Sequence, residues 1–60
     1  MNANRADVRR LSRAAARCRS LADQTASPEL RQWYQHLAET RAAEAGRIAS
    51  QIERWETRLR

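Results

Sequence analysis

The segment Thr-Ala-Ser-Pro-Glu-Leu at residues 25–30 divides an otherwise uniform sequence and decides its fold. Ser27 is a favourable N-cap, because its hydroxyl can accept an unpaired backbone N–H of the following turn. Pro28 then takes the first helical position, where its missing N–H costs nothing, and Glu29 adds negative charge beside the positive helix end. One helix therefore begins at residue 28, and an earlier helix ends just before it.

A second helix start lies near the N-terminus. Asn4 can cap a helix, and Asp7 follows three residues later, where the acid of a capping box belongs. The flanking segments are rich in Ala, Arg, Leu and Glu and have no β-branched run, which favours helix. We predict an all-α fold of one domain over residues 1–60, an antiparallel hairpin with helices at about residues 4–25 and 28–59.

The chain is short and poor in large apolar side chains. Of its 60 residues 42% are hydrophobic, but twelve of these are Ala. A lone chain of this size is marginally stable, and disulfides, a metal or a partner are the usual supports. One Cys and one His provide neither an internal disulfide nor the common four-ligand zinc site. We therefore expect a homodimer or a larger protein partner, with the hairpin completing a four-helix bundle or coiled coil.

Apolar residues follow helical spacing in both predicted helices. The first helix has the three-and-four spacing of a coiled-coil seam at Val8, Leu11, Ala15, Cys18 and Ala22. The second has a bulkier stripe with a period near 3.6 at Leu30, Tyr34, Leu37, Ala45, Ile48, Ile52, Trp55 and Leu59. Folding at Ser27 is expected to set Ala22 near Leu30. The same fold sets Val8 near Ala45. The large side chains of the second helix are then expected to pack against the small side chains of the first.

The two predicted helices differ in length. About 22 residues span ~33 Å and about 32 residues span ~48 Å, so the first helix ends opposite about residue 49. The end of the second helix then projects as an uncovered stripe, and its Trp belongs to the residue types enriched at interface hot spots. The predicted protein interface comprises Ile48, Ile52, Trp55, Leu59, Trp33 and Arg41. The alternative is that residues 1–6 are also helical and cover part of this stripe.

Two residues of the second predicted helix are unusual for their positions. Arg41 lies in the centre of the apolar stripe, and Glu44 can pair with it on the same face. Either the Arg41 stem covers the core while its head reaches solvent, or Arg41 sets the register in a bundle of four or more helices. Gly46 weakens the helix by ~1 kcal/mol relative to Ala, or it marks the close approach of a neighbouring helix.

Positive charge is concentrated in the first helix. Twelve basic residues, all Arg, against seven acidic ones give a formal net charge of +5, and residues 1–27 carry six Arg and two Asp, net +4. A ridge opposite the seam consists of Arg9, Arg10, Arg13 and Arg17. These arginines could bind a phosphate backbone or an acidic protein surface, or they could form a helix face that contacts only water. No aromatic residue lies among these arginines, so there is no base-stacking platform.

The sequence assembles no recognisable catalytic or metal site. His36 and Glu39 form a lone His-x-x-Glu, and two helices offer no concave pocket of ligand size. We predict no enzymatic activity, no cofactor and no small-molecule substrate. No apolar run approaches the ~18 residues of a membrane span, and the N-terminus lacks the apolar core of a secretory signal. The unpaired Cys18 suits a reducing cytoplasm, as a small buried residue or as a disulfide at a dimer axis.

The segments RCRSLA at residues 17–22, SPELR at 27–31 and LAE at 37–39 resemble a group of small proteobacterial helical-hairpin proteins of unknown function. The resemblance covers about residues 17–39 and implies a hairpin, with no activity to transfer. In architecture alone, the chain is also similar to small plasmid-copy-control RNA-binding hairpins that dimerise into four-helix bundles. The exclusive use of Arg over Lys is typical of a GC-rich bacterial or phage gene.

These observations predict a non-enzymatic interaction module. It is expected to self-associate, to dock on a larger protein as a small accessory, regulatory or inhibitor subunit, or both. The alternative is a dimeric hairpin that binds RNA or DNA through the arginines of the first helix. A membrane-surface helix is disfavoured, because the second helix mixes five Glu with its arginines.

Overall fold

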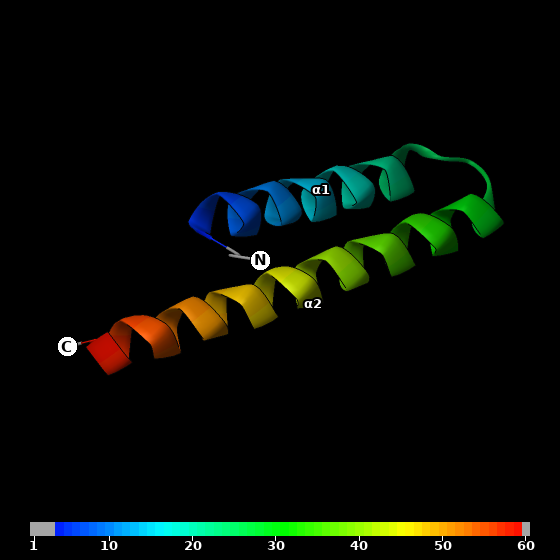
Figure 1. Ribbon diagram of the computed structural model, residues 1–60. Coiled ribbons are helices and arrows are strands. Elements are labelled where there is room, and N and C mark those ends of the chain that lie inside the picture. Colours follow the sequence, from blue (N-terminus) through cyan, green and yellow to red (C-terminus); the bar gives the residue numbers. More distant parts are fainter. Residues whose placement is uncertain (1–3, 60) are drawn as a thin grey trace.

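The computed structural model describes residues 4–59 and shows an antiparallel two-helix hairpin (Figure 1). Helix α1 spans Arg5–Gln24 and helix α2 spans Pro28–Leu59. Each end differs from the sequence prediction by at most one residue, and the described residues contain no strand. The predicted all-α hairpin is therefore confirmed.

A complete capping box begins α1. The backbone N–H of Asp7 donates to the side-chain oxygen of Asn4 at 3.1 Å, and the backbone N–H of Asn4 donates to the Asp7 carboxylate at 3.0 Å. Two backbone donors that a helix start leaves unpaired are thereby satisfied. Residues 5 and 6 belong to α1, whereas the rest of the predicted extension, residues 1–3, lies outside the described residues.

The turn between the helices is also closed by local hydrogen bonds. Thr25 ends α1 with an extended backbone, and its N–H donates to the carbonyl oxygen of Leu21 at 3.1 Å. At the start of α2, the N–H of Leu30 donates to the Ser27 hydroxyl at 3.3 Å. The guanidinium of Arg31 donates back to the Thr25 carbonyl at 3.1 Å. Ser27 is thus the predicted N-cap, and Pro28 is the first residue of α2.

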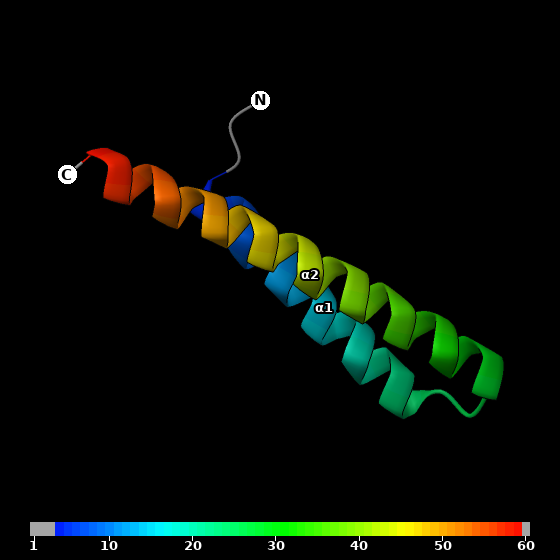
Figure 2. The same cartoon turned by 90° about the horizontal axis from the view of Figure 1, so that it is seen from below.

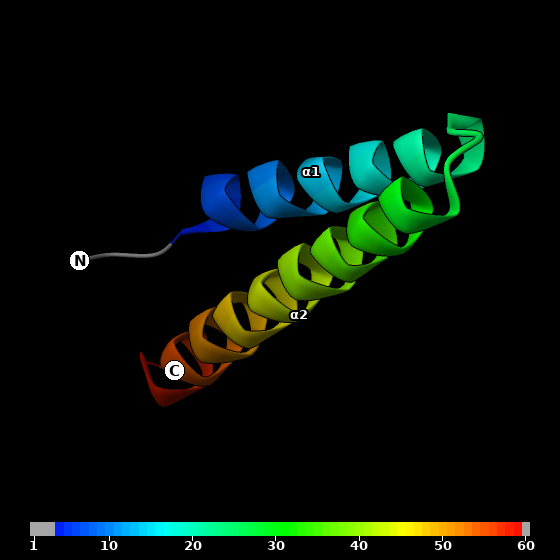
Figure 3. The same ribbon diagram turned by 90° about the vertical axis from the view of Figure 1, so that its right-hand side faces the viewer.

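The two helices meet along a seam of alanines. Among residues 4–59 the fully buried side chains are Ala15 and Ala22 of α1 and Ala38 and Ala45 of α2. Small side chains let the two backbones approach closely at these alanines, and the helices cross at an angle and diverge toward the start of α1 (Figures 2 and 3). The other predicted seam residues of α1, namely Val8, Leu11 and Cys18, are half-buried. The seam is therefore thin, and the bulkier apolar side chains lie at its margins.

The predicted alignment of the two helices is wrong by about two turns. Ala22 lies in a groove with Ala38 instead of near Leu30, and Val8 lies beside Ile52 instead of near Ala45. The physical reason is the link of residues 25–27, which is not helical and begins with an extended backbone at Thr25. These residues carry the chain past the end of α1 before α2 begins, so α2 overhangs at the turn (Figure 1).

The surplus length of α2 is consequently shared between its two ends. Leu30 and Trp33 overhang at the turn, and Leu59 overhangs at the free end, where α1 reaches as far as Glu56. The resulting hairpin measures 50 × 18 × 14 Å and has a radius of gyration of 14.3 Å. A compact chain of this length has a radius of gyration of about 10 Å. The hairpin is therefore a flat rod with one layer of helices.

Candidate protein-interaction surface

Four large apolar residues form a straight row along α2. They are Leu30, Leu37, Ile48 and Trp55, separated by steps of seven, eleven and seven residues. At about 100° per residue, each step brings the side chain back to within about 20° of the previous one. We refer to these four residues as the apolar row. The sequence predicted the apolar stripe of the second helix, but it did not single out these four residues within the stripe.

Exposure increases toward both ends of the apolar row. Leu37 and Ile48 are half-buried beside α1, whereas Leu30 is 47% exposed and Trp55 is 60% exposed. The ends are open because α1 has no residues beside Leu30 and begins at Arg5, near the level of Trp55. The exposed apolar area of the row therefore lies at its two ends, around Leu30 and Trp55.

Aromatic and aliphatic residues extend the row at each end. The ring of Trp33 contacts that of Tyr34, with centroids 5.2 Å apart and planes tilted by 59°, and Trp33 is 54% exposed. At the free end, the guanidinium of Arg58 lies over Trp55 at 5.8 Å from the ring centroid. Leu59 is 75% exposed. The predicted exposure of Trp55 and Leu59 is thus confirmed.

The two edges of the alanine seam differ in chemistry. At one edge, a groove of about 490 Å³ is lined around Ala22 and Ala38 by polar or charged side chains: Arg19, Asp23, Gln35 and Glu39. The apolar row lies at the other edge. Helical spacing places Cys18 and Leu21 of α1 at that same edge. The hairpin therefore has one polar face and one apolar face.

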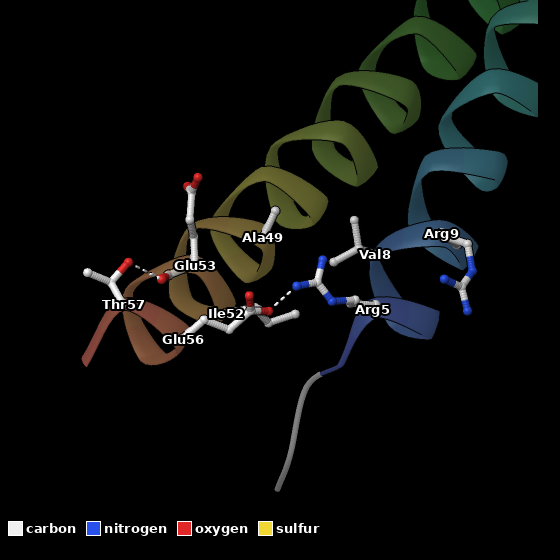
Figure 4. Close-up of a pocket in the computed structure, with 8 residues that line it drawn as sticks. All are labelled: Arg5, Val8, Arg9, Ala49, Ile52, Glu53, Glu56 and Thr57. Atoms are coloured by element: carbon white, nitrogen blue, oxygen red, sulfur yellow. Dashed lines mark hydrogen bonds and ion pairs between the residues drawn. The ribbon is translucent and has the colours of Figure 1, made fainter. Parts of the chain in front are cut away.

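Ile52 departs from the sequence prediction. It was expected to project beyond α1 without cover, but it is half-buried and points toward Val8 across a groove of about 570 Å³ (Figure 4). The guanidinium of Arg5 donates to the carboxylate of Glu56 on the same side (Figure 4). The sequence did not predict this ion pair, because the N-terminal end of α1 was expected opposite about residue 49 of α2. It lies about two turns further along α2, beside Glu56. The pair joins the first turn of α1 to the last turns of α2.

Two charged residues fill the gap in the middle of the apolar row. Arg41 and Glu44 lie between Leu37 and Ile48, and both are half-buried. The predicted ion pair between them is not formed, because the ion pairs of residues 4–59 are Arg5–Glu56 and Arg10–Asp7. Arg41 and Glu44 thus have no partner of opposite sign within the described chain, and their charged atoms still reach water in the single hairpin.

The arginine ridge of α1 lies where the sequence placed it. Arg9, Arg10, Arg13 and Arg17 are all exposed, on the side of α1 that faces away from α2. A shallow hollow of about 660 Å³ brings them together with Ala14 and Cys18. Arg10 is bound by the carboxylate of Asp7. In the described part of the chain, Arg9, Arg13 and Arg17 have no carboxylate within 4.0 Å.

The remaining cysteine, histidine and acidic side chains form no cluster in the described residues. Cys18 is a free, half-buried thiol, and both His36 and Glu39 are exposed. Within residues 4–59, no three His, Cys, Asp or Glu side chains are grouped so that they could bind a metal ion. Neither described helix has an apolar stretch of the length needed to cross a membrane.

Comparisons with known proteins give no relative for this chain. No protein-family model matches it, and no significant match was found to a curated protein or to a solved structure.

Proposed function

We propose that the chain is a non-enzymatic protein–protein interaction module. It self-associates through the apolar face of the hairpin and completes a four-helix bundle with a second chain, in the cytoplasm, as an accessory, regulatory or inhibitor subunit. The observation that carries the proposal is the content of the core, since only alanines are fully buried in residues 4–59. Burying an alanine methyl removes little apolar area from water, so one hairpin gains little free energy by folding alone.

The exposed area supports the same conclusion. The chain exposes 5064 Å², whereas a compact protein of 7.0 kDa exposes about 4,000 Å². The excess of about 1,000 Å² is close to the ~800 Å² that each partner buries in a standard interface. One further layer of helices against the apolar face is therefore sufficient to bring the chain to an ordinary exposure.

Sedimentation equilibrium combined with thermal unfolding tests the proposal. We expect a mass of twice 7.0 kDa and a midpoint of unfolding that rises with protein concentration, because association stabilises only the folded chain. Trp55→Ala should shift the sedimentation mass from that of the dimer toward that of the monomer, while leaving helicity largely intact. Arg47→Ala, at an exposed residue of α2 off the apolar face, is the matched control and should change neither.

Two other outcomes separate the alternatives. A chain that is largely unfolded alone and becomes helical on a larger protein would show that the partner is not a second copy. A chain that unfolds cooperatively as a monomer, with a concentration-independent midpoint that Trp55→Ala leaves unchanged, would contradict the proposal as a whole.

A nucleic-acid-binding function is the second candidate, and the three unpaired arginines of the ridge favour it. Arg9, Arg13 and Arg17 present exposed guanidinium groups with no intramolecular carboxylate to compete for them. A gel shift with RNA and duplex DNA across a salt series tests this function. Binding that falls steeply with salt and is lost in the triple Ala variant of these arginines would support it. Absence of a shift at low salt would exclude it.

A further inference from the structure

The apolar row is symmetric about its own centre. Leu30 and Trp55 are equally far along the sequence from the midpoint between residues 42 and 43, and Leu37 and Ile48 are also equally far from it. The two half-buried residues, Leu37 and Ile48, lie nearer the midpoint, and the two exposed residues, Leu30 and Trp55, lie at the ends of the row. An antiparallel copy of α2 would therefore present a large apolar side chain opposite each member of the row, because the spacing is the same in both directions.

The charges in the gap of the row obey the same symmetry. Arg41 and Glu44 are equally far from the midpoint between residues 42 and 43, and they carry opposite charges. Both are half-buried, and neither has an ion-pair partner among residues 4–59. Removing a charge from water is costly unless a group of opposite charge is supplied. The partner missing from the chain is present in a second copy of it.

We propose that two copies of this chain pair antiparallel along α2, with a twofold axis at the midpoint between residues 42 and 43. In a twofold interface, each residue meets the residue related to it by the axis, and the contact occurs twice. Arg41 of each copy then meets Glu44 of the other. Leu37 meets Ile48 and Leu30 meets Trp55 in the same way. The inference rests on the proposed self-association and specifies its orientation and register.

Charge selects this orientation over a parallel one. In a parallel pair in register, Arg41 meets a second Arg41 and Glu44 meets a second Glu44. Like charges placed opposite each other in a partly desolvated interface are strongly unfavourable. In the antiparallel pair both charge contacts become attractive, and each member of the row still meets a large apolar side chain. A polar contact at one level of a helical bundle is also a well-attested means of fixing its register.

The extent of the row suits a stable interface. From residue 30 to residue 55, α2 runs for about 38 Å. This length covers the overhang of α2 at the turn and the part of α2 that lies beside α1. Because the arginine ridge lies on the side of α1 away from α2, pairing through α2 leaves one ridge exposed on each copy.

Charge reversal tests the contact. Arg41→Glu and Glu44→Arg should each weaken self-association at least about tenfold, because each places two like-charge pairs at the axis. An equimolar mixture of the two variants should associate like the wild type, as should the double variant R41E/E44R. Arg47→Glu is the control, a reversal of the same kind at an exposed residue of α2, and should leave the dissociation constant unchanged.

Cross-linking in a Cys18→Ala background tests the orientation. With a short bismaleimide reagent, a mixture of Leu37→Cys and Ile48→Cys chains should cross-link between the two variants, whereas either variant alone should not. Efficient linking of Leu37→Cys to itself would show a parallel pair and overturn the inference.

The two levels of the proposal fail in different ways. A wild-type chain that sediments as a monomer removes the self-association itself. A wild-type dimer that both single charge reversals leave unchanged keeps the interaction module and refutes the antiparallel pairing. Recovery of association in the mixture and in the double variant, together with the mixed cross-link, supports both.

Discussion

Replacing Gly46 with Ala should stabilise the protein without changing its association. Gly46 lies inside α2 with an ordinary helical backbone and no positive φ angle. A Cβ atom built at this position meets nothing within 4 Å, so the added methyl causes no clash within the chain. Helical rotation places Gly46 roughly opposite the apolar row. The substitution therefore changes helix propensity alone if the row is the surface that binds a partner.

The size of the effect follows from propensity and chain length. Gly is ~1 kcal/mol less favourable than Ala inside a helix, chiefly because Gly loses more backbone entropy on folding. With an unfolding entropy of about 2.1 cal/mol/K per residue, 60 residues convert 1 kcal/mol into a rise of about 8 °C in the midpoint. The shift is the same for a dimer, because the gain and the entropy both double.

Thermal unfolding by circular dichroism at several concentrations measures this shift. Ala43→Gly is the matched inverse, since Ala43 is exposed and lines the same shallow surface as Gly46, and it should lower the midpoint by a similar amount. Destabilisation by Gly46→Ala, or a loss of mass in solution, would show that another helix packs against Gly46. The reasoning that places the interface on the apolar row would then be refuted.

Three further predictions concern the hairpin itself, each read as a free energy of unfolding from urea titration. Asn4→Ala removes the side-chain acceptor of the capping box and should cost about 1 kcal/mol, with Asn4→Ser retaining most of the stability. Ala38→Leu introduces a large side chain where the alanine seam is fully buried, and it should cost about 1–3 kcal/mol by forcing the helices apart. An unchanged stability in Ala38→Leu would show that the seam is not tightly packed. Glu56→Gln removes the ion pair with Arg5. The Glu56 side chain is 43% exposed and the Arg5 side chain 68% exposed, so the loss should cost less than about 1 kcal/mol. A larger loss would mean that this pair is shielded from water by another chain.

The helices could be predicted from the sequence because their ends are fixed by neighbouring residues. The Ser27–Pro28 start and the Asn4–Asp7 capping box need only hydrogen bonds between residues three apart, and both are present. The exposure of Trp55 and Leu59 was equally predictable, since both lie on the apolar stripe near an end of the longer helix. Local spacing was sufficient for each of these features.

The alignment of the helices could not be predicted in this way. It depends on the backbone direction of residues 25–27, and a three-residue link can either fold straight back or run outward first. Thr25 adopts an extended conformation, and Arg31 reaches back to its carbonyl, which sets the two-turn offset. The error moved Ile52 from a half-buried position to an exposed one. It also hid the Arg5–Glu56 ion pair, since both depend on which residues of α1 and α2 are neighbours.

The division between small and large apolar residues agrees with the proposed self-association. A hairpin that had to be stable alone would gain most by placing its leucines, isoleucines and tryptophans in the seam, where burial contributes about 1.5–3 kcal/mol for each side chain. This chain places alanines there and leaves the larger side chains at one edge. A thin seam brings α1 close to α2 and keeps the row of α2 accessible from the side. The half-buried Arg41 and Glu44 weaken that face for any partner that does not supply matching charges. In the proposed pairing, the partner is a helix with the opposite order of charges, which a second copy of the chain supplies.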